Sequence, residues 1–241
     1  MRRAGRVVAR VFDEIEERIR PGVTTKHLDR LVERVIRGAG CVPSFLGYRG
    51  FPASACISIN EEIVHGIPGP RRLEEGDLVK IDVGAIHDGY HADSAWTFYV
   101  GDEPPEEVAR LMRVTEDSLW AGIAQARAGN RVGDVSHAIQ HVAEEAGFSV
   151  VREYVGHGVG RELHEDLQVP NYGVPGRGPR LEEGMTLALE PMVNAGGWRT
   201  EVLGDRWTVV TADRELSAHY EHTIAITDGA PLVLTARNGE G

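Results

Sequence analysis

A segment that occurs twice is the feature that most limits what this chain can fold into. Residues 72–82 read RLEEGDLVKID, and residues 180–190 read RLEEGMTLALE. Five identical letters open both copies, and the apolar run that follows ends in a carboxylate each time. A second stretch indicates the same duplication, because residues 20–40 align without gaps on residues 127–147 with nearly the same offset. We therefore expect two halves of related structure.

The predicted halves cover roughly residues 1–102 and 103–230 of a single domain, residues 1–241. Each half is expected to contain two helices followed by strands, because apolar residues recur first at helical spacing and then in short runs between turn residues. Duplicated halves of this kind pair about a pseudo-twofold axis, so that their matching strands face each other. The predicted fold class is therefore α+β, with antiparallel strands.

Turn and capping residues set the expected bounds of these elements. In the first half, one helix is expected to end before Pro21-Gly22, and Thr24 or Thr25 is expected to cap the second. In the second half, one helix is expected to end near Gly129-Asn130, and the next to begin after Asp134 as its cap. The predicted strands are residues 55–59, 77–86 and 91–100, and then the segments EYVGHGVG, MTLALEPMV, RWTVVTA and HYEHTIAIT.

The chain is acidic, with 37 Asp and Glu residues against 26 Lys and Arg. No basic cluster is longer than two residues, which argues against nucleic acid or an anionic membrane as a partner. No apolar run is long enough to span a membrane, and arginines interrupt the N-terminal segment where a signal peptide needs an apolar stretch. Cys41 and Cys56 are too few for a disulfide scaffold, so we expect a reducing cytoplasm.

Two carboxylates are predicted to share one face of a hairpin in the first half. The pair Asp88-Gly89 is a strong signal for a two-residue turn, and it places Asp93 opposite Gly84. Asp82 then lies on the same face, one diagonal away, with the two backbones roughly 7–8 Å apart. Because such carboxylates repel each other unless a cation lies between them, we predict a metal ion at this position.

The second half supplies matching acids. Through the repeat, Asp82 corresponds to Glu190, and Asp93 corresponds to Glu221 if about 20 residues are inserted between the two strands. Glu190 ends an apolar strand, where an unpaired buried charge would cost several kcal/mol. We therefore expect four carboxylates, two from each half, to converge on the axis. The alternative is that these acids lie at exposed strand ends.

Three histidines accompany these acids: His65 in IVHGIPG, His157 in VGHGVG and His164 in ELHED. Imidazole together with carboxylates suits Mn, Fe or Co as a ligand set. The alternative for each histidine is an ordinary surface or core position.

Five motifs in order along the chain resemble one known family. VHGIPG, IDVGAIHDGYHADS, GHGVGRELHED, LALEPMV and HYEHTIAIT are similar to successive signatures of the type I methionine aminopeptidases, which have the pita-bread fold. The resemblance covers nearly the whole chain. The chain has neither the N-terminal zinc-binding extension of the eukaryotic type I enzymes nor the helical insertion of the type II enzymes. A bacterial-type enzyme is therefore expected.

The resemblance implies two divalent metal ions per chain, which could be Co, Mn, Fe or Zn. Asp93 and Glu221 would bridge the ions, His157 and Glu190 would complete one site, and Asp82 would complete the other. His65, His164 and Glu190 would be catalytic, and the two histidines would also contact the substrate. The resemblance places these residues around the methionine side chain: Tyr48, Phe51, Cys56, Leu163 and Trp207, with Phe45 at the rim.

An apolar lining with a sulfur atom suits the thioether of methionine, although plain core packing is the alternative for each of these residues. The chain departs from the family at several positions. Leu163 replaces a commoner phenylalanine, which makes the shape of the pocket uncertain. His219 replaces a commoner glutamine, close to Glu221 in the sequence.

The activity that the resemblance implies is removal of the N-terminal methionine from nascent proteins and peptides with a small second residue. A hydroxide held by the two metal ions would attack the peptide carbonyl, and Glu190 would carry the proton to the leaving amine. Nascent chains are the expected partners, with transient association at the ribosome, and the protein is expected to be a monomer.

Two other functions remain open from the sequence. The first is an Xaa-Pro aminopeptidase or prolidase on the same fold, although such chains usually carry an additional N-terminal domain. The second is a pita-bread protein that binds partners without catalysis, although such proteins lose metal ligands and this chain retains all five.

Overall fold

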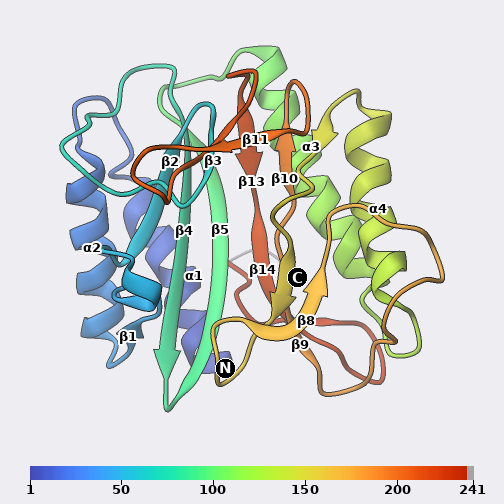
Figure 1. Ribbon diagram of the computed structural model, residues 1–241. Coiled ribbons are helices and arrows are strands. Elements are labelled where there is room, and N and C mark those ends of the chain that lie inside the picture. Colours follow the sequence, from blue (N-terminus) through green and yellow to red (C-terminus); the bar gives the residue numbers. More distant parts are fainter. Residues whose placement is uncertain (238–241) are drawn as a thin grey trace.

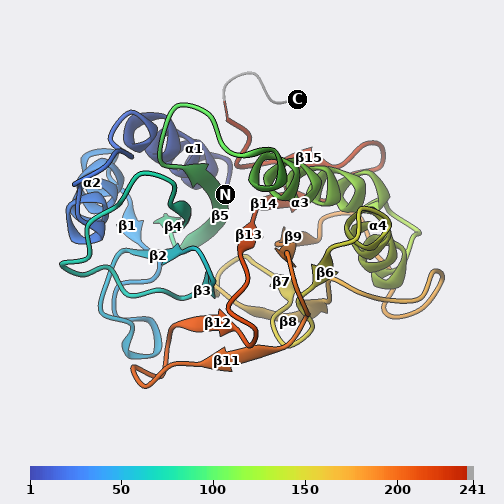
Figure 2. The same cartoon turned by 90° about the horizontal axis from the view of Figure 1, so that it is seen from above.

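All four helices found in the described residues, 1–237, cover the same side of a large β-sheet in this computed structural model (Figures 1 and 2). The first helix pair packs behind the N-terminal strands, and the second pair packs behind the C-terminal strands. The helices are α1 (Arg2–Glu16), α2 (Thr25–Gly38), α3 (Glu106–Gln125) and α4 (Val132–Glu145). Two helices per half were predicted, and the α+β class is confirmed.

The helix ends differ in detail from the prediction. Helix α1 ends at Glu16, before the predicted stop at Pro21-Gly22. Thr24 caps α2, since its side chain accepts a hydrogen bond from the backbone N–H of His27. The predicted cap of α4 was wrong, because Asp134 lies in its first turn and accepts from the backbone N–H of Arg131 at 2.8 Å.

The central sheet has nine strands, and its main path runs in the order β1-β4-β5-β14-β9-β7-β8. Strand β2 adds to β4, and β15 adds to β14. The strands of this sheet are β1 (Val42–Pro43), β2 (Ala55–Ile59), β4 (Leu78–His87), β5 (Tyr90–Tyr99), β7 (Gly156–Gly158), β8 (Glu165–Val169), β9 (Thr186–Leu189), β14 (Glu221–Ala225) and β15 (Leu232–Val233).

Two smaller sheets flank the central one, with three strands each, in the orders β13-β10-β6 and β11-β12-β3. A short 3₁₀ helix, Tyr48–Gly50, lies in the loop between β1 and β2. The strands of the smaller sheets are β3 (Glu62–Val64), β6 (Ser149–Val150), β10 (Met192–Asn194), β11 (Thr200–Val202), β12 (Val209–Thr211) and β13 (Ser217–His219).

The hairpin β4–β5 has the predicted register. His87 pairs with Tyr90 and Gly84 pairs with Asp93, so the chain turns at Asp88-Gly89. Both turn residues have positive φ angles, 51° and 77°, as a type I′ turn requires. This turn therefore fixes which face of the hairpin carries the carboxylates.

The same contacts recur at equivalent positions of the two halves. An isolated antiparallel bridge joins Thr24 to Arg72 in the first half, and another joins Arg131 to Arg180 in the second. In both halves the arginine of the repeated RLEEG segment therefore pairs with the residue just before a helix. These matched bridges support the predicted duplication, and the division at residue 102 stays a prediction.

The two halves meet at a seam, which is the pairing of β5 with β14. The hydroxyl of Thr223 accepts from the backbone N–H of Asp93 at 2.8 Å and donates to the carbonyl of Asp93 at 2.7 Å. The hydroxyl of Ser94 donates to the carbonyl of Glu221. Side-chain hydroxyls thus hold the two carboxylate-bearing strands in register across the seam.

Candidate active site

The five predicted metal ligands come from neighbouring strands of the central sheet. From one side of the seam to the other they are Asp82 on β4, Asp93 on β5, Glu221 on β14, Glu190 directly after β9, and His157 on β7. Each half supplies two carboxylates, as the repeat predicts. Strand β9 ends at Leu189, since Pro191 follows two residues later. Glu190 therefore lies directly after the end of this strand.

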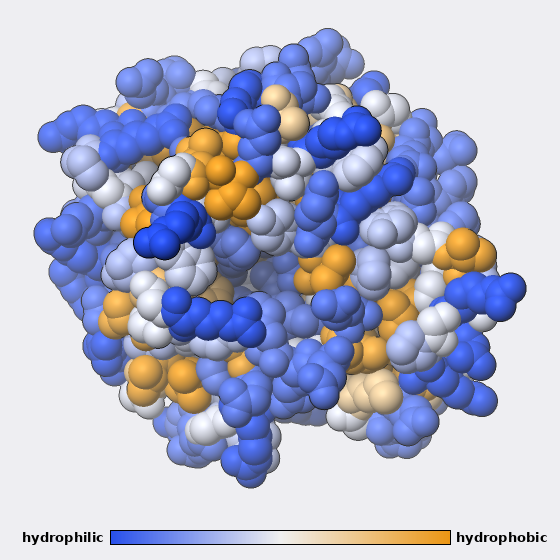
Figure 3. Space-filling model, viewed as in Figure 1, coloured by the Kyte–Doolittle hydropathy of each residue, from blue (hydrophilic) through white to orange (hydrophobic). Residues whose placement is uncertain are grey.

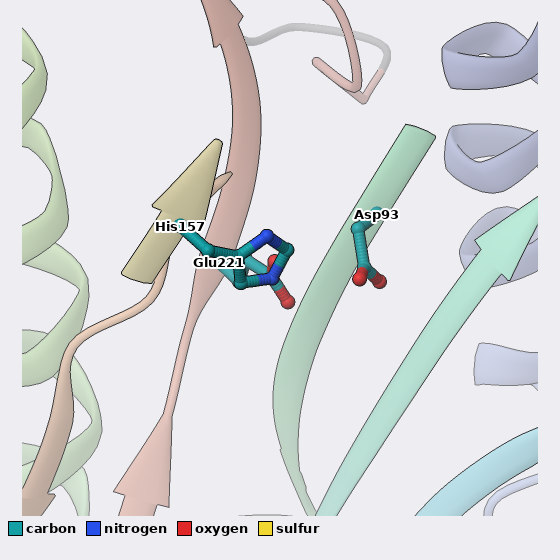
Figure 4. A group of neighbouring side chains, drawn as sticks. All are labelled: Asp93, His157 and Glu221. Carbon is teal, nitrogen blue, oxygen red and sulfur yellow. The ribbon is translucent and has the colours of Figure 1, made fainter. Parts of the chain in front are cut away.

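The ligand atoms of these residues lie close together. Asp93, His157 and Glu221 each offer a donor atom, and the three atoms lie within 4.8 Å of one another. Figure 4 shows these side chains on three strands, with those of His157 and Glu221 directed toward Asp93. Glu190 Oε1 lies 3.5 Å from His157 Nε2. Asp82 is within hydrogen-bonding reach of Asp93. The structure therefore brings all five predicted ligands into one cluster.

One hydrogen bond sets the tautomer of His157. Its Nδ1 lies 2.8 Å from the carbonyl oxygen of Gly158, which can only accept, so Nδ1 carries the proton. The lone pair of Nε2 is then free and faces Glu190. A backbone carbonyl commonly orients a metal-binding histidine in this way.

The carboxylates are buried without sufficient compensation from the protein. Asp93 and Glu221 are 4% and 2% exposed. Among the described residues, one oxygen each of Asp82, Asp93 and Glu221 is buried and has no hydrogen-bond partner. Burial raises the pKa of all four carboxyls, and nearby carboxylates raise the pKa of Asp82, Glu190 and Glu221 further.

Divalent metal ions fit this cluster. Orphaned carboxylate oxygens and a free imidazole lone pair are the donors that Mn, Fe, Co and Zn accept. Positive charge at this position would relieve the mutual repulsion of the acids and satisfy the unpaired oxygens. The alternative of acids at exposed strand ends is excluded, because Asp93 and Glu221 are buried and Asp82 and Glu190 are partly buried.

The two other predicted histidines lie at the edge of this cluster. The His164 ring is tilted against the His157 ring with 4.1 Å between centroids, and its Nδ1 lies 2.9 Å from the hydroxyl of Tyr48. His65 packs edge-on against Tyr154, with ring centroids 5.6 Å apart. Burial lowers the pKa of His65 to about 4, so its imidazole is neutral at pH 7.

His65 also adopts an uncommon backbone conformation. Its φ angle is +61°, in the left-handed region that non-glycine residues seldom occupy. Such residues gather at functional sites, where the surrounding structure holds them in place.

A cavity of about 150 Å³ adjoins the cluster, and the face seen in Figure 3 is hollowed near its centre. The apolar end of the cavity contains a small hydrophobic cluster that includes Phe51, Cys56 and Leu163. All the site residues predicted from the sequence line this cavity: Phe45, Tyr48, Phe51, Cys56, His65, Asp82, Asp93, His157, Leu163, His164, Glu190, Trp207 and Glu221. Their individual roles remain predictions.

The sequence prediction missed one residue of the lining, Arg49. Arg49 lies in the 3₁₀ helix between Tyr48 and Gly50. The signal for it was weak, because an arginine in a glycine-rich loop resembles any solvated surface residue. His219, in contrast, is 1% exposed and does not line the cavity.

Residues 1–228 match the family described as metallopeptidase family M24. The chain belongs to metallopeptidase family M24. Among curated M24 relatives, methionine aminopeptidase 1 of Bacillus subtilis is 54% identical over 235 residues, which are 98% of this chain and 94% of that protein. Methionine aminopeptidase 1 of Mycobacterium tuberculosis is 49% identical, over 98% of this chain and 91% of its own. The resemblance drawn from the five motifs is thus confirmed.

Solved M24 structures agree with this assignment. The crystal structure of methionine aminopeptidase from Thermotoga maritima has a TM-score of 0.96 and 47% sequence identity, and covers 98% of this chain and 95% of its own. The prolidase from Pyrococcus furiosus has a TM-score of 0.80 at 22% identity, and this chain covers 63% of it. At that identity the prolidase shows a shared fold alone, and the pita-bread fold is confirmed.

Within residues 1–237, no helix combines the length and the apolarity needed to cross a bilayer.

Proposed function

We propose that this protein removes the N-terminal methionine from nascent proteins and peptides whose second residue is small. The observation that carries the proposal is a charged cluster of one histidine and four carboxylates at one end of a cavity whose other end is apolar. Relatives at about half identity over nearly the whole chain, named methionine aminopeptidases, support it.

Two divalent metal ions would be held by the cluster, and Asp93 and Glu221 would contribute ligands to both. His157 and Glu190 would complete one site, and Asp82 would complete the other. Bound ions would supply a lowered pKa for a coordinated water and a polarised substrate carbonyl. Co, Mn, Fe and Zn all remain candidates for the identity of the metal.

Glu190 is proposed to move the proton. Its carboxylate is 14% exposed and lies beside His157, so it reaches both the cluster and the cavity. A carboxylate within reach of the attacking water can accept its proton as a general base. The same group then delivers the proton to the amine that leaves.

The two histidines are proposed to bind the peptide and stabilise developing charge. The Tyr48 hydroxyl fixes the His164 ring through Nδ1, which leaves Nε2 for the substrate. His65 is neutral at pH 7 and can donate one hydrogen bond to the peptide.

The apolar end of the cavity is proposed to hold the methionine side chain. Its walls include aromatic rings, among them Phe51 and Trp207 with centroids 5.1 Å apart, and the sulfur of Cys56. An unbranched thioether fits such a lining and makes favourable contacts with aromatic rings.

The proposal extends to the setting of the enzyme. We infer a bacterial cytoplasmic monomer that meets nascent chains at the ribosome. Both cysteines are free and buried, which is compatible with a reducing compartment.

Peptide specificity tests this function against the prolidase alternative. The metal-loaded protein is incubated with Met-Ala-Ser, Ala-Ala-Ser and Ala-Pro-Ser peptides, and products are identified by mass spectrometry. We expect cleavage of Met-Ala-Ser alone, with loss of one methionine. Preferred cleavage of Ala-Pro-Ser would assign the prolidase activity instead, and no cleavage of any peptide would support a binding protein.

A further inference from the structure

Arg49 is the one lining residue of the cavity that the proposed chemistry does not use. The other charged side chains of the lining are the four carboxylates of the metal cluster. Arg49 is exposed, so it lies where the cavity opens to solvent. It places a positive charge at the mouth of a site whose floor is negative.

The guanidinium of Arg49 is part of a stack that leads to His164. Its Cζ lies 5.3 Å from the centre of the Tyr48 ring. The Tyr48 ring in turn stacks on the His164 ring at a centroid distance of 5.3 Å and an interplanar angle of 23°. One aromatic ring, that of Tyr48, therefore separates Arg49 from His164, which is proposed to bind the peptide.

The backbone keeps the side chain in this position. Arg49 has a φ of +48° and a ψ of +24°, in the left-handed region, between two residues of a one-turn helix. Gly47 donates its backbone N–H to the carbonyl of Phe51 at 2.8 Å, which closes the loop on itself. A non-glycine residue in this conformation is held at some energetic cost, and such residues gather at ligand clamps.

Arg49 has no acidic partner among the described residues, 1–237. In this part of the chain its guanidinium forms no ion pair and no side-chain hydrogen bond, and it contacts the Tyr48 ring. A guanidinium has five N–H donors, and two of them can bind a carboxylate in bidentate geometry. A partner from the substrate would satisfy these donors.

We propose that Arg49 selects peptides with an acidic side chain at the third position, such as Met-Ala-Glu. This inference rests on the proposed function, because the methionine must occupy the apolar end of the cavity for the third residue to reach its mouth. An extended chain advances about 3.3–3.6 Å per residue. Two residues beyond the scissile bond therefore span about 7 Å, which is more than the 5.3 Å between the Arg49 guanidinium and the Tyr48 ring that stacks on His164.

A second hollow beside the site favours the opposite preference. It is also lined by His164 and carries three acids, Glu162, Glu165 and Asp166. If the peptide leaves the site over this hollow, a basic third residue would be favoured. Arg49 lines the same cavity as the metal cluster, whereas none of these three acids does. The guanidinium is therefore the charge that a peptide bound in this cavity meets.

The test is the kcat/KM ratio of two amidated peptides, Met-Ala-Glu-Ser and Met-Ala-Lys-Ser, measured with the wild type, Arg49→Gln and Arg49→Glu. Amidation removes the terminal carboxylate, which would otherwise compete for the arginine. We expect the wild type to favour glutamate by about threefold to tenfold, chiefly through KM, as for an exposed ion pair between enzyme and substrate. The preference should shrink in 0.5 M salt.

Arg49→Gln should bring the ratio close to one, and Arg49→Glu should invert it. Arg110→Gln is the matched control. Arg110 lies on α3, outside the cavity, and its Cζ stacks 4.7 Å from the centre of the Phe148 ring. Its loss should leave the ratio unchanged. A wild-type ratio near one, a preference for lysine, or an equal ratio in all Arg49 variants would overturn the inference. Failure to cleave either peptide would instead overturn the proposed function.

Discussion

Lys80 is a buried amine on β4, and its replacement should change how stability depends on pH. The residue is 2% exposed on β4, two positions before Asp82 and therefore on the same face of the strand. Its Nζ donates to the carbonyls of Asn60 at 2.7 Å and Leu78 at 3.3 Å. Burial lowers the pKa of Lys80 from 10.5 to about 7.

This shift fixes the sign and the size of the effect. Between pH 7 and 10.5 the unfolded chain holds the Lys80 proton while the folded chain has released it, so the free energy of unfolding rises with pH. Each pH unit contributes about 1.4 kcal/mol, which amounts to about 4 kcal/mol between pH 7 and pH 10. Lys80→Met has no such group, and both carbonyls keep a backbone donor, from Ser217 and Asn60 respectively.

The assay is urea unfolding of metal-free wild type and Lys80→Met at pH 7, 8.5 and 10. We expect the variant to be more stable by several kcal/mol at pH 7 and the gap to close by about 4 kcal/mol at pH 10. Lys26→Met, at an exposed position of α2, is the matched control for loss of one lysine. A gap that stays constant to within about 1 kcal/mol across this range would refute the reasoning.

Three further predictions concern the reaction. Glu190→Gln should lower kcat on Met-Ala-Ser by about 10²–10⁴-fold with unchanged circular dichroism, because the proton carrier is lost, and near-normal turnover would contradict that role. Tyr48→Phe removes the hydrogen bond to His164 but keeps the ring, so kcat/KM should fall about twofold to tenfold. An unchanged kcat/KM would show that this hydrogen bond does not contribute to catalysis. Because Leu163 gives the apolar end of the cavity an aliphatic side chain, norleucine-Ala peptides should compete well with Met-Ala peptides, and strict preference for methionine would count against this.

The register of the first hairpin was predictable because it depends on two residues. Asp88 and Gly89 accept positive φ angles, and the turn they form determines every pairing of β4 with β5. That Asp82 and Asp93 share one face of the hairpin followed from side-chain alternation alone. The repeat then predicted the matching acids of the second half, Glu190 and Glu221, since equivalent strands of the two halves lie on either side of the seam.

Other features depend on tertiary contacts that one sequence does not reveal. The segment HYEHTIAIT looks like one strand, yet it divides at Tyr220 into β13 and β14, which belong to different sheets. The insertion between β9 and β14 carries Trp207, which reaches the cavity because β12 pairs with the distant β3. Local periodicity contains no information about such pairings.

The position of Arg49 could not be foreseen for a similar reason. Its place at the mouth of the cavity depends on stacking with Tyr48 and on a left-handed backbone, and neither has a signature in the composition of the loop. The cap of α4 was mispredicted because Asp134 is a good capping residue both at the N-cap and three positions into the helix.

Metal dependence of peptide cleavage tests the central claim most directly. Metal-free protein is assayed on Met-Ala-Ser before and after addition of Mn, Fe, Co or Zn singly, with Asp93→Asn as the matched variant. The account predicts no activity without metal, recovery of methionine release with at least one metal, and little recovery in the variant. Full activity in the presence of a strong chelator would contradict the account.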